Sequence, residues 1–378
     1  IALTISPAIR ARNWEVELRW NHWVGFAAWL FVFTILHILI SRRLPNRDPY
    51  LLPIGALLTA WGLLTIYRIN PVFGLRQSAW LLVTLVVIAA SLYLPSDLGF
   101  LRRYKYLWLT GSLVITGLTL FMGVNPLGYG PKMWLGCCGL YMQPSEPLKL
   151  LLIAYLAGYL ADRYSFLALS TSSKFSEVLS LLAPTLMMTG LAVALLIIQR
   201  DLGTASLFFL LFASTVFIAT GKKTLLAFSA VLVGLAGFAG YALFDVVKLR
   251  VNAWLNPWLD PSGGSFQIIQ SIMAIANGRL IGRGPGLGSP SLVPLAHSDL
   301  IFSAIAEEFG LFGVVALLLF IGLLAHRGLK AGMLAADAYR SYLAAGLTAY
   351  LVGQSLIIMA GSLRILPLTG ITLPFISY

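Results

Sequence analysis

The chain has 378 residues, of which 59% are apolar and 11% are charged, whereas a soluble domain carries roughly a quarter charged residues. This composition excludes an ordinary soluble globular protein. The 26 lysines and arginines outnumber the 14 aspartates and glutamates, which gives a formal net charge of +12. In a soluble protein this excess would indicate nucleic acid, but these cations lie in short connections between apolar segments. They are better explained as topology determinants that face anionic lipid, with no nucleic-acid partner.

Apolar segments long enough to cross the hydrocarbon layer, which takes about 20 helical residues, recur along almost the whole chain. We therefore predict an all-α polytopic membrane protein with about ten transmembrane helices. The predicted spans are Trp23–Ile40, Leu51–Tyr67, Ala79–Leu94, Tyr106–Gly123, Pro147–Ala161, Leu179–Ile198, Gly203–Thr220, Leu225–Phe244, Leu300–Ala325 and Tyr339–Gly361. One long interruption, Asp245–Asp299, separates the eighth span from the ninth. Because it has no spanning signal, it lies outside the bilayer or lines an enclosed cavity.

Alternate short connections between the spans differ in their cation content. One set holds thirteen lysines and arginines, namely Arg42, Arg43, Arg47, Arg102, Arg103, Lys105, Arg163, Lys174, Lys222, Lys223, Arg327, Lys330 and Arg340. The other set holds five, namely Arg68, Arg76, Lys132, Arg200 and Arg364. The positive-inside rule places the richer set in the cytoplasm. The long loop and both chain ends are then expected on the outer side.

Charge near a span is costly, so each acidic residue there needs an explanation. The predicted topology places Glu146, Asp201, Asp260 and Asp299 on the outer side. Glu146 follows Ser145, which we expect to cap the fifth span, and it lies three residues before Lys149. Two explanations of this pair are compatible: an ion pair that shields the lysine from lipid, and a charged pair that lines a polar cavity open to the outside.

Two further acidic sites have helix-capping patterns. Asp201 is expected to cap the seventh span. His297-Ser298-Asp299 leads into the ninth span and then into Glu307-Glu308, for which a structural role is the safer expectation. His297 has no second histidine or cysteine at ligand spacing, so the sequence disfavours a zinc site.

Within the outer loop, a run of turn-forming residues from Asn256 to Gln267 surrounds a single carboxylate, Asp260, and a short helix that carries Gln270 and Ser271 follows. An aspartate before proline is most often a turn residue. The alternative is a carboxylate base among fixed cations, which suits acid–base chemistry on an anionic, phosphorylated substrate. The cations expected on this side are Lys132, Arg200, Arg250, Arg279, Arg283 and Arg364. Gly282–Gly288 lacks a strand–helix context, so we expect a flexible loop whose backbone approaches a ligand.

Taken together, these segments resemble the RodA/FtsW family, also called SEDS (shape, elongation, division and sporulation). The resemblance covers the chain from about Leu51 to its end, and the segments follow the family order. They are Lys132–Leu135, Gln143–Lys149, Asp201–Ala205, Asn256–Pro261, Gln267–Ser271, Gly282–Gly284, His297–Phe302, Ala306–Gly310 and Leu366–Tyr378. Such an ordered series is far more specific than any one motif.

The resemblance implies a peptidoglycan glycosyltransferase of cell elongation or division that joins lipid II units outside the bacterial cytoplasmic membrane and releases undecaprenyl diphosphate. It makes Asp260 the expected catalytic carboxylate. Residues expected to bind substrate or line the cavity are Lys132, Trp134, Glu146, Lys149, Asp201, Arg250, Gln267, Gln270, Arg283, His297 and Asp299. A divalent cation, Mg²⁺ or Mn²⁺, and a class B penicillin-binding protein are the expected companions. The competing hypotheses are a transporter of lipid-linked sugars and a non-catalytic scaffold.

Three departures from the family pattern limit the comparison. Arg200 replaces the usual proline before Asp-Leu-Gly-Thr, and the first span, within residues 23–40, is additional after an external segment of residues 1–22. The family continues beyond Ser377-Tyr378 with a final helix, which would make eleven spans. The domain expected to carry the activity is residues 51–378, with its outer loop at residues 245–299.

Overall fold

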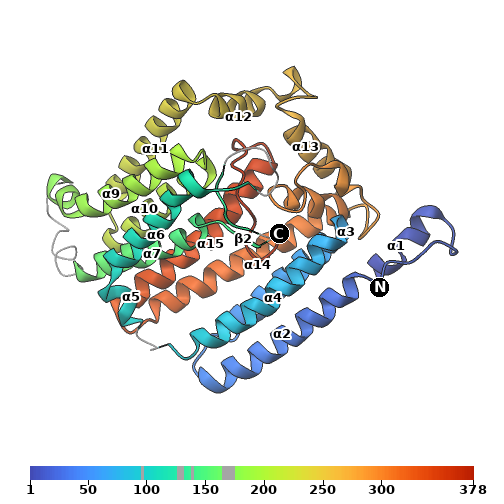
Figure 1. Cartoon of the computed structure of the whole chain (residues 1–378), viewed down its shortest axis with the longest axis horizontal. Helices are drawn as coiled ribbons and strands as arrows, with labels where there is room; N and C mark the ends of the chain where they lie inside the picture. The colour runs from blue at the N-terminus through green and yellow to red at the C-terminus, as the bar shows by residue number, and fades with distance from the viewer. Residues whose placement is uncertain (95–97, 126–131, 138–139, 164–174) are drawn as a thin grey trace. The chain divides into compact units, whose positions relative to one another are not determined.

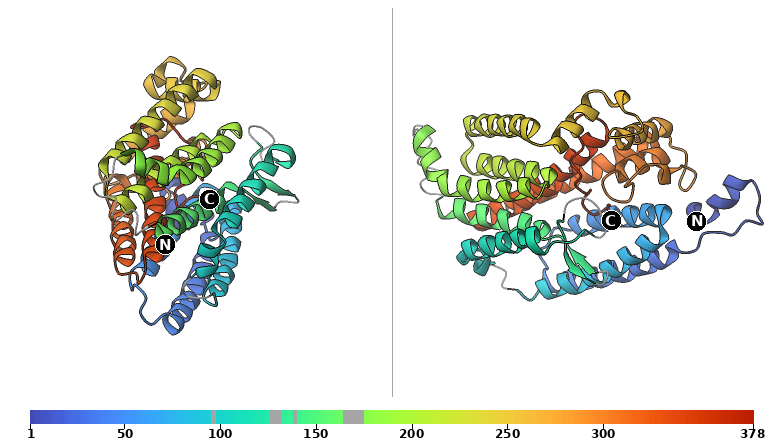
Figure 2. Two further views of the ribbon diagram at one scale, coloured as in Figure 1. Left: turned by 90° about the vertical axis from the view of Figure 1, so that its left-hand side faces the viewer. Right: turned by 45° about the horizontal axis from the view of Figure 1, so that its top comes forward.

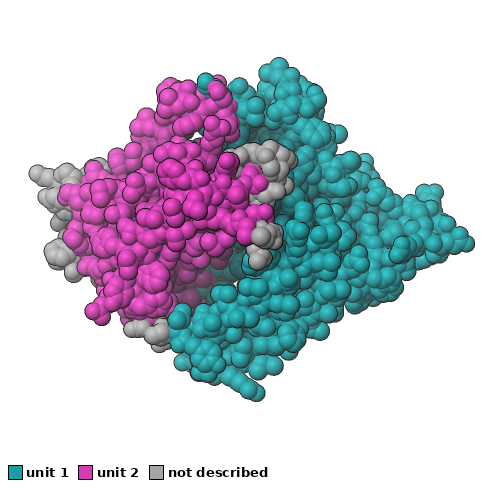
Figure 3. All heavy atoms as spheres, in the orientation of Figure 1, with its two compact units in different colours: residues 1–94, 247–327, 354–378 teal, residues 95–246, 328–353 magenta. Residues whose placement is uncertain are grey.

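In the computed structural model the described residues are 1–94, 98–125, 132–137, 140–163 and 175–378. They form two compact units, which Figure 3 shows in separate colours. Unit 1 comprises residues 1–94, 247–327 and 354–378, and unit 2 comprises residues 95–246 and 328–353. Lys174, one of the cations counted above, lies outside the described residues.

Unit 1 joins segments from both ends of the sequence. Its elements are α1 (Ala2–Ala11), α2 (His22–Arg43), α3 (Leu51–Ile69), α4 (Pro71–Ser91), most of α12 (Asp245–Leu255), the 3₁₀ turns η2 (Pro257–Leu259) and η3 (Pro290–Leu292), α13 (Phe266–Gly278), most of α14 (Ile301–Met333) and the end of α15 (Ala338–Ser362). Helices α2, α3 and α4 pack against one another, as the blue ribbons of Figures 1 and 2 show. Gly25 and Gly74 leave room for the Tyr67 ring, where a Cβ would overlap it.

Unit 2 is built around α7 (Ser145–Asp162), of which twelve residues are buried. Its other elements are α5 (Gly99–Arg103), α6 (Lys105–Met122), β1 (Leu135–Cys137), β2 (Leu140–Met142), α9 (Phe175–Ile198), α10 (Leu202–Thr220), α11 (Lys223–Leu243) and the remaining parts of α14 and α15. Helices α5, α6, α9 and α10 pack against α7. The apolar core between them includes Leu148, Leu152, Tyr155 and Phe208.

The prediction of an all-α polytopic membrane protein is confirmed. Within the described residues, nine helices are long and apolar enough to cross a membrane: α2, α3, α4, α6, α9, α10, α11, α14 and α15. The remaining predicted span, Pro147–Ala161, lies within α7. This helix has 18 residues but carries Glu146, Lys149 and Asp162. Most of its apolar residues are buried inside the unit, which explains how a charged helix of this length is accommodated.

The structure corrects three local expectations. Helix α7 begins at Ser145 after an N-cap at Pro144, and the Ser145 hydroxyl is buried without a hydrogen-bond partner among the described residues, so Ser145 is not the cap. A short antiparallel hairpin, β1–β2, was not predicted; it pairs Leu135 with Met142. The outer loop contains the predicted short helix as α13, but it also contains α12, which was not predicted.

Helix α14 is not continuous. Gly310 has φ 64° and ψ −160°, so the helix breaks within the predicted ninth span. The break leaves backbone groups without their helical partners, and in a membrane protein such groups must be satisfied by other parts of the chain.

Candidate active site

Asp260 lies in an exposed turn that its own carboxylate stabilises. It directly follows η2, and its Oδ2 atom accepts a hydrogen bond of 2.7 Å from the backbone N–H of Gly264. The backbone N–H of Ser265 donates to the Asp260 carbonyl oxygen at 3.3 Å. A Cβ at Gly263 would overlap the carboxylate, so only glycine fits this close approach. The expected turn role is therefore present, and it holds the exposed carboxylate in a fixed position.

The segment before Asp260 is held by Arg364. The guanidinium group of Arg364 donates hydrogen bonds of 2.7 Å to the carbonyl oxygens of Trp254 and Leu255, at the end of α12. The Trp254 indole N–H donates in return to the carbonyl oxygen of Arg364 at 3.1 Å. Cations at a helix C-terminus satisfy its unpaired carbonyls and its dipole. Arg364, expected to serve as an outer cation near the substrate, thus binds the end of α12.

The C-terminal segment brings three further predicted residues together in unit 1. Arg250 donates to the carbonyl oxygen of Thr369 at 3.1 Å. A Cβ at Gly370 would lie 3.5 Å from an Arg250 nitrogen and 3.6 Å from an Asp299 oxygen, so both side chains converge on this glycine. Tyr378 donates its backbone N–H to the carbonyl oxygen of His297 at 2.9 Å.

The His297 imidazole lies against aromatic rings, with centroid distances of 4.7 Å to Phe73 and 6.1 Å to Tyr378. Burial lowers the pKa of His297 below its ordinary value of 6.5. The neutral ring is thereby favoured, so His297 is better suited to packing and hydrogen bonding than to carrying a positive charge.

The glycine-rich loop packs against the break in α14. Arg283 and Gly284 donate their backbone N–H groups to the carbonyl oxygens of Glu307 and Glu308 at 2.9 and 3.0 Å. Leu311, just after the break, donates to the carbonyl oxygen of Arg279 at 3.0 Å. The expectation of a flexible loop whose backbone approaches a ligand is therefore wrong for this stretch, because these amides already have partners.

The side chains of the loop and of α13 have varied environments. Gln267 and Arg283 are exposed, Gln270 is half-buried, and Arg283 lies 3.4 Å from the Asn277 side-chain oxygen. Ser271 is buried and contacts the Ser303 hydroxyl at 2.6 Å, which ties α13 to α14. The exposed side chains are the ones that are available to a ligand.

Both glutamates just before the break, Glu307 and Glu308, have structural partners. Glu308 accepts hydrogen bonds from the Arg68 Nε atom at 3.1 Å and from the backbone N–H of Gly286 at 3.0 Å. Glu307 accepts from the backbone N–H of Ser289 at 3.1 Å. These contacts agree with the structural role expected for the acidic pair. The sequence predicts Arg68 only as a cation of the outer connections, and the structure adds its ion pair with Glu308.

In unit 2, three predicted polar residues, Glu146, Lys149 and Asp201, lie at the starts of α7 and α10. The Lys149 Nζ atom lies 2.7 Å from Glu146 Oε1, and the lysine side chain is 1% exposed whereas the glutamate side chain is 49% exposed. Lys149 Nζ also lies 5.3 Å from the centroid of the Tyr350 ring. A buried ammonium group needs a charged partner, which the Glu146 carboxylate provides. That carboxylate is itself partly exposed. Both explanations given above for this pair fit these contacts.

Asp201 is confirmed as the cap of α10, since its Oδ1 atom accepts the backbone N–H of Thr204 at 3.1 Å. Its other oxygen accepts from the Gln143 side chain at 3.3 Å, so the turn before α7 is tied to the start of α10. Trp134 exchanges backbone hydrogen bonds of 2.8 and 3.2 Å with Val124, and Lys132 is exposed.

The predicted residues thus form two groups, one in each unit. Asp260, Arg250, Gln267, Gln270, Arg283, His297 and Asp299 belong to unit 1, and Lys132, Trp134, Glu146, Lys149 and Asp201 belong to unit 2. Sequence reasoning missed Tyr350 and the roles of Arg364 and Arg68. The only sequence signal for the two arginines was the rarity of charged residues near apolar spans, which predicts a partner but does not identify it. Tyr350 gave no such signal.

The described residues contain no group of three or more histidine, cysteine, aspartate or glutamate side chains that could hold a metal ion. Mg²⁺ is commonly bound by one or two carboxylates together with phosphate oxygens of the substrate. The exposed carboxylate of Asp260 could supply one such ligand. The residues therefore fit a divalent cation only as the companion of a phosphorylated ligand.

Comparison with known proteins identifies the family. The family model for FtsW, RodA and SpoVE proteins, described as "cell cycle protein", matches residues 51–378. The peptidoglycan glycosyltransferase RodA of Mycobacterium bovis is 33% identical over 385 residues, which cover 97% of this chain and 81% of the relative. The stage V sporulation protein E of Bacillus subtilis is 31% identical over 351 residues, which cover 90% of this chain and 93% of the relative.

Solved structures agree with this relationship. A chain from a study of the structural coordination of polymerization and crosslinking by a peptidoglycan synthase complex has a TM-score of 0.72 and 28% identity, over 88% of this chain and 92% of that chain. The rod shape determining protein RodA of Thermus thermophilus has a TM-score of 0.52 and 22% identity, over 95% and 89% of the two chains, and supports the fold alone. Since the family match covers most of the sequence and the curated relatives are covered over most of their length, the chain is a multi-pass membrane protein of the FtsW/RodA/SpoVE family.

Proposed function

We propose that the protein is a peptidoglycan glycosyltransferase that polymerises lipid II on the outer side of the bacterial cytoplasmic membrane and releases undecaprenyl diphosphate. The observation that carries the proposal is the family match over residues 51–378 together with relatives named for this activity. The exposed, hydrogen-bonded carboxylate of Asp260 in the outer loop supports it chemically. The substrate and the orientation of the site belong to the proposal.

In the proposed reaction, a sugar hydroxyl of the acceptor attacks the anomeric carbon of the donor. The new carbon–oxygen bond forms as the bond to the diphosphate breaks, and Asp260 accepts the proton that the hydroxyl loses. Direct displacement of this kind inverts the configuration at the anomeric carbon. A positioned carboxylate suits the proton transfer, because a general base must lie within hydrogen-bond reach of the proton it takes.

The departing diphosphate accumulates negative charge that fixed cations can stabilise. Arg250 and Arg283 are the candidates in unit 1, and Lys132 and Lys149 are the candidates in unit 2. A divalent cation, Mg²⁺ or Mn²⁺, is proposed only as a companion of the diphosphate, where it would neutralise charge. We further propose a class B penicillin-binding protein as the partner that cross-links the new strand; the related peptidoglycan synthase complex, which couples polymerization with crosslinking, supports this partner.

The test is glycan-strand formation from purified lipid II, with the penicillin-binding partner and Mg²⁺ present, for the wild type, Asp260→Ala and Asp260→Asn. Because general-base catalysis contributes roughly 100-fold to 10,000-fold to a rate, both variants should lose activity by about that factor. Asp337→Asn, which alters a carboxylate of an exposed ion pair, is the control and should remain active.

Two outcomes would contradict the proposal. A folded Asp260→Ala protein that polymerises at the wild-type rate would exclude Asp260 as the base. Absence of product with the wild type, with lipid II binding intact, would instead favour a transporter or a scaffold.

A further inference from the structure

The middle of the outer loop, residues 279–283, forms a tip that is attached to α14 at its break. The backbone N–H of Phe312 donates to the carbonyl oxygen of Leu280 at 3.2 Å, so the tip lies at the level of Gly310. The side chains of Leu280 and Ile281 are nevertheless 62% and 79% exposed. Two adjacent large apolar side chains that a fixed backbone keeps exposed indicate a binding surface.

The length of α14 after its break gives the depth of the 279–283 tip in the membrane. Near its other end, Arg327 donates to Asp48 Oδ2 at 2.8 Å, and both residues belong to connections that the predicted topology places at the cytoplasmic surface. Gly310 lies 17 residues before Arg327, which corresponds to about 25 Å of helix. Since the hydrocarbon layer is about 30 Å thick, the break and the tip lie just inside its outer edge. A tilt of the helix would place them deeper.

The exposed side of α14 continues the apolar surface of the tip. Phe312, Val315 and Leu319 are 70%, 45% and 62% exposed. They are three and four residues apart, so they lie on one side of the helix. In a membrane-spanning helix such an apolar side faces lipid chains. Because Phe312 is bonded to the tip, the tip extends this lipid-facing surface toward the headgroups.

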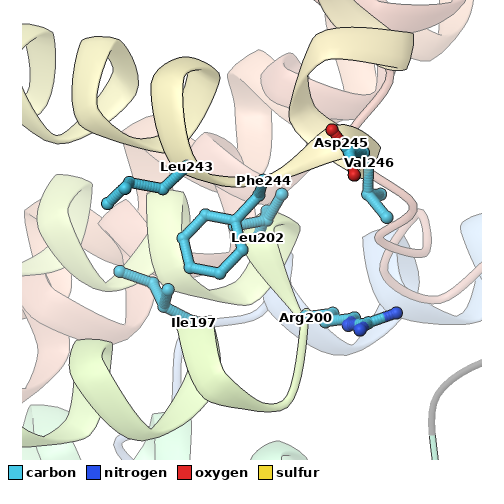
Figure 4. Close-up of a pocket in the computed structure, with 7 residues that line it drawn as sticks. All are labelled: Ile197, Arg200, Leu202, Leu243, Phe244, Asp245 and Val246. Atoms are coloured by element: carbon cyan, nitrogen blue, oxygen red, sulfur yellow. The ribbon is translucent and has the colours of Figure 1, made fainter.

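Arg279, the first residue of the tip, has a strained backbone and a free cation. Its φ of 51° and ψ of −141° suit glycine better than a residue with a side chain. Its exposed guanidinium group has no hydrogen bond or ion pair among the described residues. Arg200 in unit 2 also has a left-handed φ, of 63°, but it lines a cavity of about 150 Å³ with Phe244 and Asp245, as Figure 4 shows. Arg279 lies instead at the end of an exposed apolar surface.

The charge of the segment matches an anionic lipid. Residues 279–292 contain two arginines, Arg279 and Arg283, and no acidic residue, and both arginines are exposed. Arginine side chains near the membrane surface extend along apolar surface and place their charge among the headgroups. Cations there are attracted to anionic lipid.

We propose that the 279–283 tip inserts Leu280 and Ile281 into the outer edge of the hydrocarbon layer and that Arg279 binds the phosphate group of an anionic phospholipid. The outer loop is then attached to the membrane between α13 and η3, as well as at its two ends. The hydrogen bonds between the tip and α14 reduce the cost of bringing this irregular backbone to the hydrocarbon.

Spin labels on single cysteines test the insertion in the full chain, reconstituted in vesicles of equal amounts of dioleoyl phosphatidylcholine and dioleoyl phosphatidylglycerol. In a Cys137→Ser, Cys138→Ser background, a label at Ile281→Cys should be accessible to oxygen, which dissolves in hydrocarbon, and protected from a water-soluble nickel chelate. Leu319→Cys is the control for hydrocarbon, and Ser262→Cys, at an exposed loop position, is the control for water.

Two results would overturn the insertion. The nickel chelate could reach the label at position 281 as readily as the label at position 262, which would place the tip in water. Alternatively, neither reagent could reach the label at position 281, which would show that a protein surface, such as a second copy of this chain, covers the tip.

Fluorescence quenching tests the headgroup. A fluorophore at Ile281→Cys should be quenched more by phosphatidylglycerol with a nitroxide on its acyl chain than by phosphatidylcholine labelled in the same way. Arg279→Gly, which removes the cation and relaxes the backbone, should reduce this preference by about fivefold, the contribution of one cation at an anionic membrane surface. Arg279→Lys, which keeps the charge, should retain most of it.

Arg12→Gly is the matched control, because Arg12 is also exposed and has φ 52° at the end of α1, in the segment predicted to lie outside the membrane. It should leave the preference unchanged. Thermal unfolding in detergent should show that both glycine variants fold. An unchanged preference for phosphatidylglycerol in Arg279→Gly, or an equal reduction in Arg12→Gly, would overturn the binding of the phosphate by Arg279.

Discussion

At the scale of single residues, Arg68 and Glu308 form an ion pair in which both partners are buried. Both side chains are 7% exposed, and Arg68 also donates to the carbonyl oxygen of Gly288 at 2.8 Å. Glu308→Gln keeps the shape of the side chain but leaves the arginine buried without a counter-charge. Breaking a buried pair in this way typically destabilises a protein by about 3–5 kcal/mol. We expect a loss of this size in the free energy of unfolding, measured by chemical unfolding in detergent.

The control for this experiment is the pair Asp337–Arg340, whose side chains are about five times as exposed, at 42% and 37%. Removing an exposed partner with Asp337→Asn should change the stability by less than about 1 kcal/mol. Equal losses in the two variants would show that burial does not determine the strength of these pairs.

His297 should make stability depend on pH. Burial lowers its pKa in the folded protein below the ordinary value of 6.5, so in mildly acidic solution the unfolded chain binds a proton that the folded chain does not. Stability therefore decreases as the pH falls through about 6.5. We expect the unfolding temperature of the wild type to drop more between about pH 7.5 and pH 5.5 than that of His297→Phe, which keeps an aromatic ring but does not titrate.

The comparison of the two pH profiles removes the contribution of other titrating groups, since both proteins share them. Parallel profiles would mean that the protonation of His297 has no part in the acid sensitivity. The carbonyl oxygen of residue 297, which accepts from Tyr378, is present in both proteins.

The sequence predicted single residues well where the pattern is local. The cap at Asp201 depends on its own helix start, and the turn at Asp260 depends on neighbouring glycines and prolines, so both could be read from short segments. The roles of Arg364 and Tyr350 could not be predicted from short segments. Each contacts a group more than 100 residues away in the chain, and no periodicity in the sequence specifies such a partner.

At the scale of elements, the break in α14 depends on three glycines that allow two backbones to touch. A Cβ at Gly310 would overlap the backbone nitrogen of Gly282, one at Gly282 would overlap the carbonyl oxygen of Glu308, and one at Gly278 would overlap that of Ala306. The close approach lets the loop supply the hydrogen bonds that the broken helix lacks. The 278–284 loop and the break therefore form one structural element.

Gly310→Ala should disrupt this element. An alanine at φ 64° and ψ −160°, a conformation that is essentially confined to glycine, is strained by roughly 1–3 kcal/mol, and its Cβ would push the loop away. We expect a loss of at least about 2 kcal/mol in the free energy of unfolding, with faster hydrogen exchange at the amides of Arg283 and Gly284. Gly322→Ala is the matched control in the same helix, because a Cβ there meets nothing within 4 Å. It should be neutral or stabilising by about 0.5–1 kcal/mol, and a similar loss in both variants would contradict the role of the break.

Long apolar elements were predictable from the sequence, but irregular ones were not. A run of 18 or more apolar residues permits few structures other than a membrane-spanning helix, so the spans could be located from composition alone. A glycine within such a run is compatible with a continuous helix, so the break at Gly310 gave no signal. The hairpin β1–β2 has only three residues in each strand, too few for alternation to be recognised.

At the scale of the whole molecule, the family match begins at residue 51, so α1 and α2 precede the part of the chain that the family model describes. Within unit 1 these helices are nevertheless integrated. Arg10 of α1 donates to the Ser289 hydroxyl at 3.1 Å, and α2 packs against α3 and α4. The N-terminal segment therefore supports the outer loop that lies in the same unit as Asp260.

The orientation of the chain in the membrane is the last prediction, and the proposed reaction depends on it. The thirteen cations of one set of connections, against five in the other, predict that the loop containing Asp260 faces outward and the loop between α2 and α3 faces the cytoplasm. In a Cys137→Ser, Cys138→Ser background, single cysteines introduced as Ser262→Cys and Asn46→Cys lie at exposed loop positions. A membrane-impermeant maleimide should label Ser262→Cys in intact spheroplasts and Asn46→Cys only after permeabilisation. The reverse pattern would place Asp260 in the cytoplasm, where a polymerase of exported lipid-linked sugars could not act, and it would refute the proposed function along with the topology.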